Sequence, residues 1–135
     1  MGTNVEAARG FIDGFNSRDF DAAVSSCSED FVLDDVPSGQ QVKGAEGLKG
    51  WLGMWGQAFG DGQIGDTRYH DAGDTVVAEA VYEGTNDGPF GPSPATGRRA
   101  TLPFCAVWNF NDRGQMVRQA AYYDMAGLMA QLSPA

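Results

Sequence analysis

The sequence predicts an α+β domain in which three amphipathic helices near the N-terminus cover a curved antiparallel sheet. Two observations predict it. Apolar residues recur at helical spacing up to Phe59, and from Asp61 onward they alternate with polar residues as in a strand. Helices and strands that occupy separate parts of a chain are typical of α+β proteins. We expect residues 1–135 to form one domain, because this length suits a single hydrophobic core.

Three segments have the spacing of amphipathic helices. The second begins after Asp19, which can cap it, and the third begins at about Ala45. Their apolar faces are Val5, Ala8, Phe11, Ile12 and Phe15; Phe20, Ala23, Val24 and Cys27; and Leu48, Trp51, Leu52, Trp55 and Phe59. Glycines recur from Gly47 to Gly60. Each interior glycine costs about 1 kcal/mol relative to alanine, so the third helix depends on tertiary packing.

Strands are predicted at residues 31–34, 64–69, 75–83, 98–111 and 115–124, with a short helix at 125–132. The even positions at 76–82 and 102–110 are all apolar or aromatic and are expected to face inward. Glycine and proline pairs at residues 84–96 predict a loop. Pro103 within a strand indicates an edge or a bulge. A long twisted sheet curls, so helices across its concave side form a cone with a pocket inside.

The charge of the chain restricts its partners. The formal net charge is -9, which repels phosphate backbones and anionic lipids, so we expect no nucleic acid and no membrane as partners. No apolar run approaches the roughly 20 residues that span a bilayer. The first residues lack the basic-then-apolar order of a signal peptide, and a cytoplasmic location is expected.

Few residues offer nucleophilic or metal chemistry. Cys27 and Cys105 lie in apolar contexts and are interpreted as buried thiols. The only histidine, His70, is placed at the end of a hairpin strand, which disfavours a Cys–His or Ser–His–Asp site. No Cys/His cluster or phosphate-binding loop is present, so neither a metal nor a cofactor is expected. Asp34 and Asp35 are interpreted as a solvated turn entrance rather than a metal site.

Three segments resemble a known family. They are Phe11-Ile12-Asp13-Gly14-Phe15-Asn16-Ser17-Arg18-Asp19-Phe20-Asp21 followed by Asp30-Phe31-Val32-Leu33-Asp34; Gly84-Thr85-Asn86 with Gly91-Pro92-Ser93-Pro94-Ala95-Thr96-Gly97-Arg98; and Tyr123-Asp124-Met125-Ala126-Gly127-Leu128-Met129-Ala130-Gln131-Leu132. The first resembles the opening of nuclear transport factor 2-like domains. The other two are similar to the SnoaL-like polyketide (ester) cyclase branch. This superfamily hosts several activities as well as binding proteins without catalysis.

The resemblance implies a cone-shaped nuclear transport factor 2-like fold, a homodimer through the outer face of the sheet, a deep pocket for a small-molecule ligand and no cofactor. In cyclases of this branch a pocket carboxylate acts as acid and base in an intramolecular aldol closure. Asp124 matches the aspartate of the terminal motif. Three positions depart from the branch, because Asn86 and Gln119 stand where histidine is common and Ala121 where a second acid is common.

Asp124 is therefore the predicted catalytic residue, and Asp124→Asn is expected to abolish turnover. A carboxylate facing an aromatic cavity is desolvated, which raises its pKa toward neutrality. The alternative is that Asp124 caps the terminal helix. The residues expected to contact substrate are Phe15, Trp51, Trp55, Tyr82, Asn86, Phe104, Trp108, Gln119 and Tyr122.

The function predicted first is a cofactor-free enzyme that acts on a hydrophobic, oxygenated, polyketide-like molecule by acid/base catalysis, with cyclisation as the reaction. A second interpretation is epoxide hydrolysis or isomerisation in the same pocket, which would need Glu79 or Arg118 to point inward. A third is a small-molecule-binding protein without catalysis, which the missing histidines favour. A purely structural interaction module is the fourth and would show a filled core.

Overall fold

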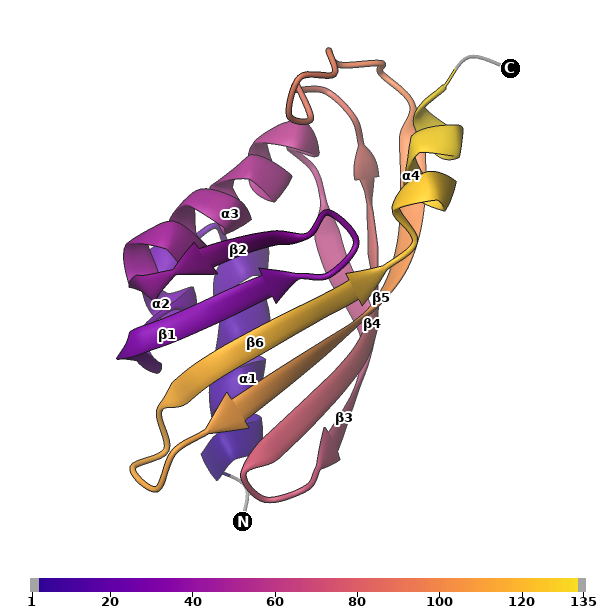
Figure 1. The fold of residues 1–135 in the computed structure, drawn as a ribbon. Helices are drawn as coiled ribbons and strands as arrows, with labels where there is room; N and C mark the ends of the chain where they lie inside the picture. Colours follow the sequence, from indigo (N-terminus) through magenta and orange to yellow (C-terminus); the bar gives the residue numbers. More distant parts are fainter. Residues whose placement is uncertain (1–2, 134–135) are drawn as a thin grey trace.

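The computed structural model describes residues 3–133, and two helices, two strands and a third helix precede four long strands and a final helix (Figure 1). The mixed α+β class is confirmed. The helices are α1 (Thr3–Asn16), α2 (Phe20–Ala23), α3 (Gly44–Ala58) and α4 (Met125–Leu132). The strands are β1 (Cys27–Asp35), β2 (Gln40–Lys43), β3 (Gln63–Asp71), β4 (Thr75–Thr85), β5 (Arg99–Phe110) and β6 (Met116–Tyr123).

The six strands form one curved sheet in the order β2-β1-β6-β5-β4-β3 (Figure 1). The prediction of a wholly antiparallel sheet is wrong at one pair, because β1 runs parallel to β6, with Leu33 opposite Gln119. Parallel neighbouring strands cannot be joined by a hairpin, so the whole middle of the chain connects the end of β1 to the start of β6. Strand β2 was not predicted, since its four residues include a single apolar side chain, Val42.

The second helix is shorter than predicted. It ends at Ala23, and Cys27 begins β1 instead of continuing the apolar face of the helix. Helix α2 lies directly against α1 at Gly14, where a Cβ atom would be 2.6 Å from the backbone nitrogen of Ala23. Glycine at this position therefore permits the close approach of the two helices.

The predicted inward faces of the two central strands are confirmed. Helix α1 contacts β3 and β4, and α3 contacts β1 and β2, so the helices cover one face of the sheet, which we call the inner face (Figure 1). On that face Val76, Ala78 and Trp108 are fully buried. The edge expected at Pro103 is also present, because β6 ends at Tyr123 opposite Phe104. Beyond that pair β4 is the one strand that pairs with β5 in the described residues, and α4 packs beside β5 there.

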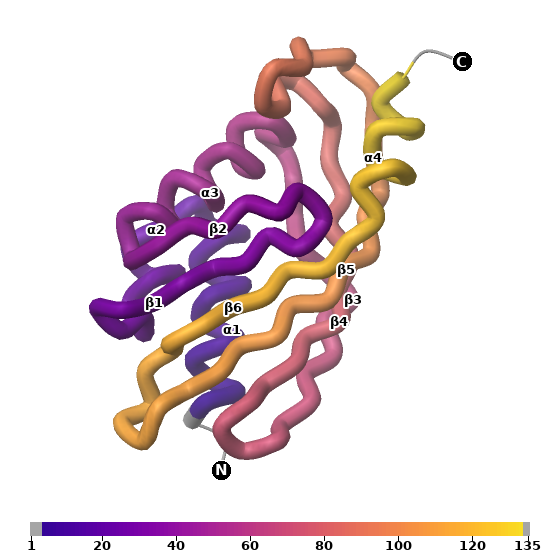
Figure 2. Tube along the Cα trace, in the orientation of Figure 1, coloured from indigo at the N-terminus to yellow at the C-terminus, as the bar shows by residue number. Residues whose placement is uncertain are grey.

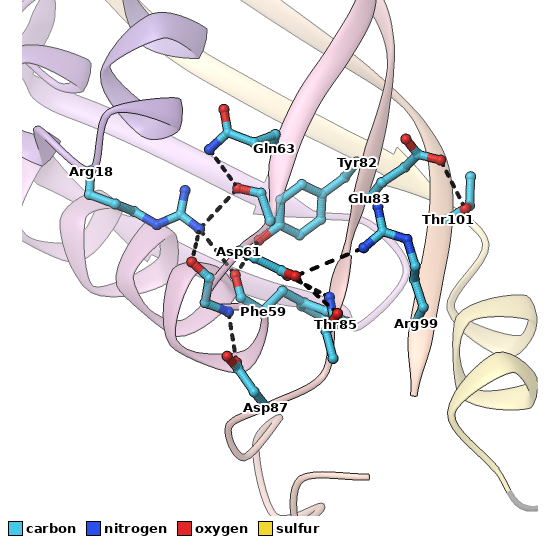
Figure 3. Close-up of polar contacts among 12 residues, drawn as sticks. Arg18, Phe59, Asp61, Gln63, Tyr82, Glu83, Thr85, Asp87, Arg99 and Thr101 are labelled. Carbon is cyan, nitrogen blue, oxygen red and sulfur yellow. Dashed lines mark hydrogen bonds and ion pairs between the residues drawn. The ribbon is translucent and has the colours of Figure 1, made fainter. Parts of the chain in front are cut away.

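Arg18 joins the C-terminal ends of two helices. Its backbone is left-handed (φ 62°), a conformation that costs a non-glycine residue about 1–2 kcal/mol. The guanidinium donates to the carbonyl of Phe15 at the end of α1, at 3.0 Å, and to three carbonyls after α3 (Figure 3). Those acceptors are Phe59 at 3.0 Å, Gly60 at 3.3 Å and Gly62 at 3.0 Å. A cation among C-terminal carbonyls stabilises both helix ends.

The connection between β4 and β5 folds back toward the end of α3 (Figure 2). Asn86, which has no exposed surface, anchors it. Its Nδ2 donates to the carbonyls of Ala58 (3.0 Å) and Gly88 (2.9 Å). Its Oδ1 accepts from the backbone nitrogen (2.8 Å) and the hydroxyl (2.9 Å) of Thr96. The amide therefore uses all of its hydrogen-bonding capacity on the loop and the end of α3, and none is directed at a ligand.

Of the helices in residues 3–133, none has both the length and the apolar character needed to cross a membrane.

Candidate functional site

An apolar cavity lies between α1, α3 and the inner face of the sheet. Its volume is about 60 Å³. Since a water needs about 10–15 Å³ on this measure, the cavity has room for a few small groups as it stands. The lining residues are Phe11, Ile12, Phe15, Trp51, Leu52, Trp55, Ile64, Tyr82, Leu102, Phe104, Ala106, Gln119, Ala121 and Tyr123.

Aromatic rings form much of this wall. The Trp55 ring packs edge-on against Tyr123 at a centroid distance of 5.3 Å and against Trp51 at 6.1 Å. Phe15 packs edge-on against Tyr82 at 5.5 Å. The hydroxyl of Tyr82 donates to the carbonyl of Trp55 at 3.0 Å, and burial raises the pKa of Tyr82 far above its usual range. This side chain is therefore a neutral structural link between β4 and α3.

Most of the predicted ligand-contacting residues lie on the cavity. Those that line it are Phe15, Trp51, Trp55, Tyr82, Phe104 and Gln119. For Trp51, Trp55, Tyr82 and Phe104, the position at the cavity follows from the aromatic face of α3 and the inward positions of β4 and β5. That they contact a ligand stays a prediction.

Three of the predicted ligand-contacting residues do not line the cavity. Trp108 is fully buried in the core, where its ring packs against Phe11 at 5.4 Å, and it does not line the cavity. Asn86 anchors the loop after β4. Tyr122 is 44% exposed on the outer face of the sheet, because neighbouring residues of a strand point to opposite faces and Tyr123 takes the inner one.

The prediction that Asp124 faces the cavity is also wrong. The residue is exposed, follows the last residue of β6, and is the N-cap of α4. Its Oδ1 accepts a hydrogen bond from the backbone nitrogen of Gly127 at 2.9 Å. Aspartate stabilises a helix start in this way, so the capping alternative accounts for its placement.

A different carboxylate lies directly behind the cavity wall. Asp35, the last residue of β1, is 3% exposed. Its Oδ2 accepts from Nε1 of Trp51 at 3.0 Å, and its Oδ1 accepts from the hydroxyl of Tyr123 at 2.7 Å. Both donors line the cavity. A buried carboxylate held by two donors is a strongly organised polar group, and here it is one side chain away from the cavity.

The neighbouring acid, Asp34, points the other way. Its carboxylate accepts from Gln41 at 2.8 Å and from Arg118 at 2.9 and 3.0 Å. The hydrogen bond from Gln41, and then Arg118, lower its pKa. The interpretation of both acids as a solvated turn entrance therefore holds for the half-exposed Asp34 and is wrong for Asp35.

Tyr123 connects Asp35 to the cavity. Burial and the hydrogen bond to Asp35 raise the pKa of Tyr123 far above its usual range, so its phenol keeps its proton. While that proton is donated to Asp35, the phenol oxygen can accept a hydrogen bond from a ligand in the cavity. Tyr123 and Asp35 are the polar residues of the site that the sequence analysis missed. Tyr123 could have been found by extending the inward positions Gln119 and Ala121.

The remaining reactive residues lie away from the cavity. Cys27 and Cys105 are free and half-buried, and burial raises the pKa of Cys27 to about 11. His70 bonds to Glu79 at 2.6 Å on the exposed side of β3 and β4. Neither Glu79 nor Arg118 lines the cavity, so the acid–arginine pair required for epoxide opening is not assembled there. Within residues 3–133, no three His, Cys, Asp or Glu side chains are grouped as a metal site.

The fold and the cavity define a class of protein in which helices and a curved sheet enclose an apolar space of the kind that holds small molecules. The sequence matches the family model described as SnoaL-like polyketide cyclase over residues 5–132, and the chain belongs to this family. No curated protein matches the chain.

Several solved structures share the fold. One, from Jannaschia sp. CCS1 and named as a SnoaL-like polyketide cyclase, has a TM-score of 0.89 at 24% identity, over 98% of this chain and 93% of the other. A second, from Xanthomonas campestris pv. campestris and named as a polyketide cyclase, has a TM-score of 0.84 at 26% identity and 97% coverage of both chains. A third, from Catenulispora acidiphila, is named for its ketosteroid isomerase-like fold and has a TM-score of 0.79 at 20% identity, over 93% and 91%.

Proposed function

We propose that this chain is a cofactor-free enzyme that moves a proton on a small, largely apolar, oxygenated molecule. The Asp35 carboxylate is its acid and base, and intramolecular cyclisation is its reaction. One observation carries the proposal: Asp35 is buried and accepts hydrogen bonds from Trp51 and Tyr123, both of which line the cavity. Membership of the SnoaL-like family supports a cyclase or isomerase reaction.

The hydrogen bond between Tyr123 and Asp35 provides a path for the proton. A ligand that loses a proton to the phenol oxygen of Tyr123 does so as the phenol proton passes to Asp35, whose Oδ1 is 2.7 Å from the phenol oxygen. The reverse transfer returns a proton to the ligand. The apolar wall keeps water away, which strengthens the polar interactions that guide each transfer.

An aldol closure balances without a cofactor. Removal of a proton from the carbon beside one carbonyl leaves an enolate, which attacks a second carbonyl of the same molecule. The resulting alkoxide takes the proton back from Tyr123 as Asp35 returns its own. The product is an isomer of the substrate, and the protein ends in its starting state.

A second candidate is a binding protein without catalysis. It is favoured by the composition of the cavity wall, where the lining residues within 3–133 include neither a carboxylate nor a histidine. In this case Asp35 serves only to hold Trp51 and Tyr123 in place.

Hydrogen exchange on a simple carbon acid separates the two candidates. In D₂O the wild-type protein is expected to accelerate deuterium incorporation beside the carbonyl of cyclopentanone or 2-tetralone above the buffer rate, as followed by proton NMR. The enzyme proposal is contradicted if both ketones bind, as shown by shifted tryptophan signals, yet exchange at the buffer rate. That result would favour the binding protein.

We also propose that the chain forms the homodimer expected from the family, through the outer face of the sheet. Tyr122 is the large side chain exposed there, beside Cys105 on the neighbouring strand. Sedimentation velocity is expected to give twice the monomer mass for the wild type, with a shift toward monomer in Tyr122→Asp. A monomer mass for the wild type at high concentration would contradict this.

A further inference from the structure

The inner wall of the cavity holds polar groups that the fold itself does not use. Gln119 on β6 is 2% exposed and lines the cavity, yet its Oε1 has no hydrogen-bond partner within residues 3–133. Trp55 on α3 is 6% exposed and also lines the cavity, and its Nε1 is likewise unpaired. One atom is an acceptor and the other is a donor.

Buried polar groups without partners are rare, because leaving one unpaired destabilises the fold. The buried amide of this chain that serves the fold alone, Asn86, makes four hydrogen bonds. Gln119 differs from it at similar burial, since its side chain ends at the cavity and makes no hydrogen bond there. The contrast indicates that the Gln119 acceptor faces a ligand.

The charge of the wall restricts that ligand further. No lining residue within the described chain is charged at neutral pH, and a charged ligand would lose its hydration without gaining a counter-charge. The ligand must therefore be neutral. It must present a hydrogen-bond donor to Gln119 and an acceptor to Trp55.

We infer that Gln119 is a specificity-determining residue that selects neutral substrates bearing a hydroxyl group, whose proton is donated to Oε1. The unpaired Nε1 of Trp55 is a donor, and it donates a hydrogen bond to an oxygen of the same molecule. This inference rests on the proposed function, which makes the cavity the substrate site. It concerns binding, whereas the proposed reaction depends on Asp35.

One rival explanation lies within the protein. Trp108 is directly opposite Gln119 across the β5–β6 ladder, and its Nε1 is also buried and unpaired. A small rotation could join this donor to the Gln119 oxygen. In that case Gln119 would stabilise the fold and have no influence on which ligand binds.

Phenol and toluene, which have the same number of heavy atoms, test the inference as probes. Their affinities are measured from the indole N–H signals of the tryptophans in NMR titrations. The wild type is expected to prefer phenol about five- to tenfold, the gain of one neutral hydrogen bond. Gln119→Leu, which keeps the size of the side chain without the acceptor, is expected to lose the preference for phenol. Leu102→Met, an apolar change in the same wall, is expected to keep the preference.

Two outcomes would overturn the inference. The first is that the wild type binds toluene as well as phenol, or binds neither. The second is that Gln119→Leu keeps the preference for phenol while its melting temperature falls, as the contact with Trp108 would predict. Because the probes undergo no reaction, these results are independent of the exchange rates that test Asp35.

Discussion

Replacing Asp35 by asparagine is expected to slow ketone hydrogen exchange about 10²- to 10⁴-fold, the usual contribution of a positioned acid or base. Asparagine has the shape of aspartate, and its amide oxygen can still accept from either Trp51 or Tyr123. It cannot take a proton from the Tyr123 hydroxyl. The loss should appear in the rate of exchange beside the carbonyl of 2-tetralone, with the far-UV circular dichroism unchanged.

The chain provides two matched controls for this result. Asp34→Asn changes the adjacent residue, whose carboxylate bonds to Gln41 and Arg118 on the opposite face. Asp124→Asn changes the residue that the family motif points to, which caps α4 and which asparagine caps equally well. Both variants are expected to exchange at the wild-type rate. An Asp35→Asn variant as fast as these controls would remove Asp35 from the mechanism.

A further variant separates transfer through Tyr123 from direct action of the carboxylate. Tyr123→Phe keeps the ring against Trp55 and removes the hydroxyl that bonds to Asp35. If the proton passes through the phenol, this variant should lose about as much exchange as Asp35→Asn. Wild-type exchange in Tyr123→Phe would show that the ketone reaches Asp35 directly.

Asn86→Ala is expected to lower the free energy of unfolding by about 3 kcal/mol, because it leaves buried partners without their hydrogen bonds. The groups affected are the carbonyls of Ala58 and Gly88 and the backbone nitrogen and hydroxyl of Thr96. They join the end of α3 to both ends of the loop after β4. Urea unfolding followed by tryptophan fluorescence measures the change.

The control for this prediction is Asn109, an asparagine on β5. It is only partly buried, and its side chain makes one hydrogen bond, from Nδ2 to the Thr75 hydroxyl at 3.1 Å. Asn109→Ala is expected to cost less than about 1 kcal/mol. Equal losses for the two variants would show that the Asn86 network contributes no more than a single surface contact.

The Asn86 network also bears on the departures from the family pattern. The position where the SnoaL-like branch commonly has a histidine is here a structural anchor, with every donor and acceptor of its amide in use. The second such position, Gln119, points into the cavity with an unused acceptor. The two replacements therefore have different surroundings: Asn86 is bonded within the protein, and of the two only Gln119 lines the cavity.

The sequence by itself determined the type of most elements and the two surfaces that enclose the cavity. Alternation at 76–82 and 102–110 identified the inward faces of β4 and β5, and the helical spacing of Trp51 and Trp55 identified the face of α3. These are local patterns, because the period of a helix or strand decides which side chains share a face. Four of the residues named for the site, Trp51, Trp55, Tyr82 and Phe104, follow from them.

Tertiary structure alone decided which carboxylate lies at the cavity. Asp34 and Asp35 are adjacent in the sequence, and their exposure depends on the pairing of β1 with β6, which is more than eighty residues further along the chain. A shift of one residue in that register would exchange their faces. Asp124 does not face the cavity as expected, because β6 ends one residue before it and α4 begins one residue after it. Long-range pairing and strand ends leave no local pattern, so the carboxylate that lies beside the cavity is visible only in the folded chain.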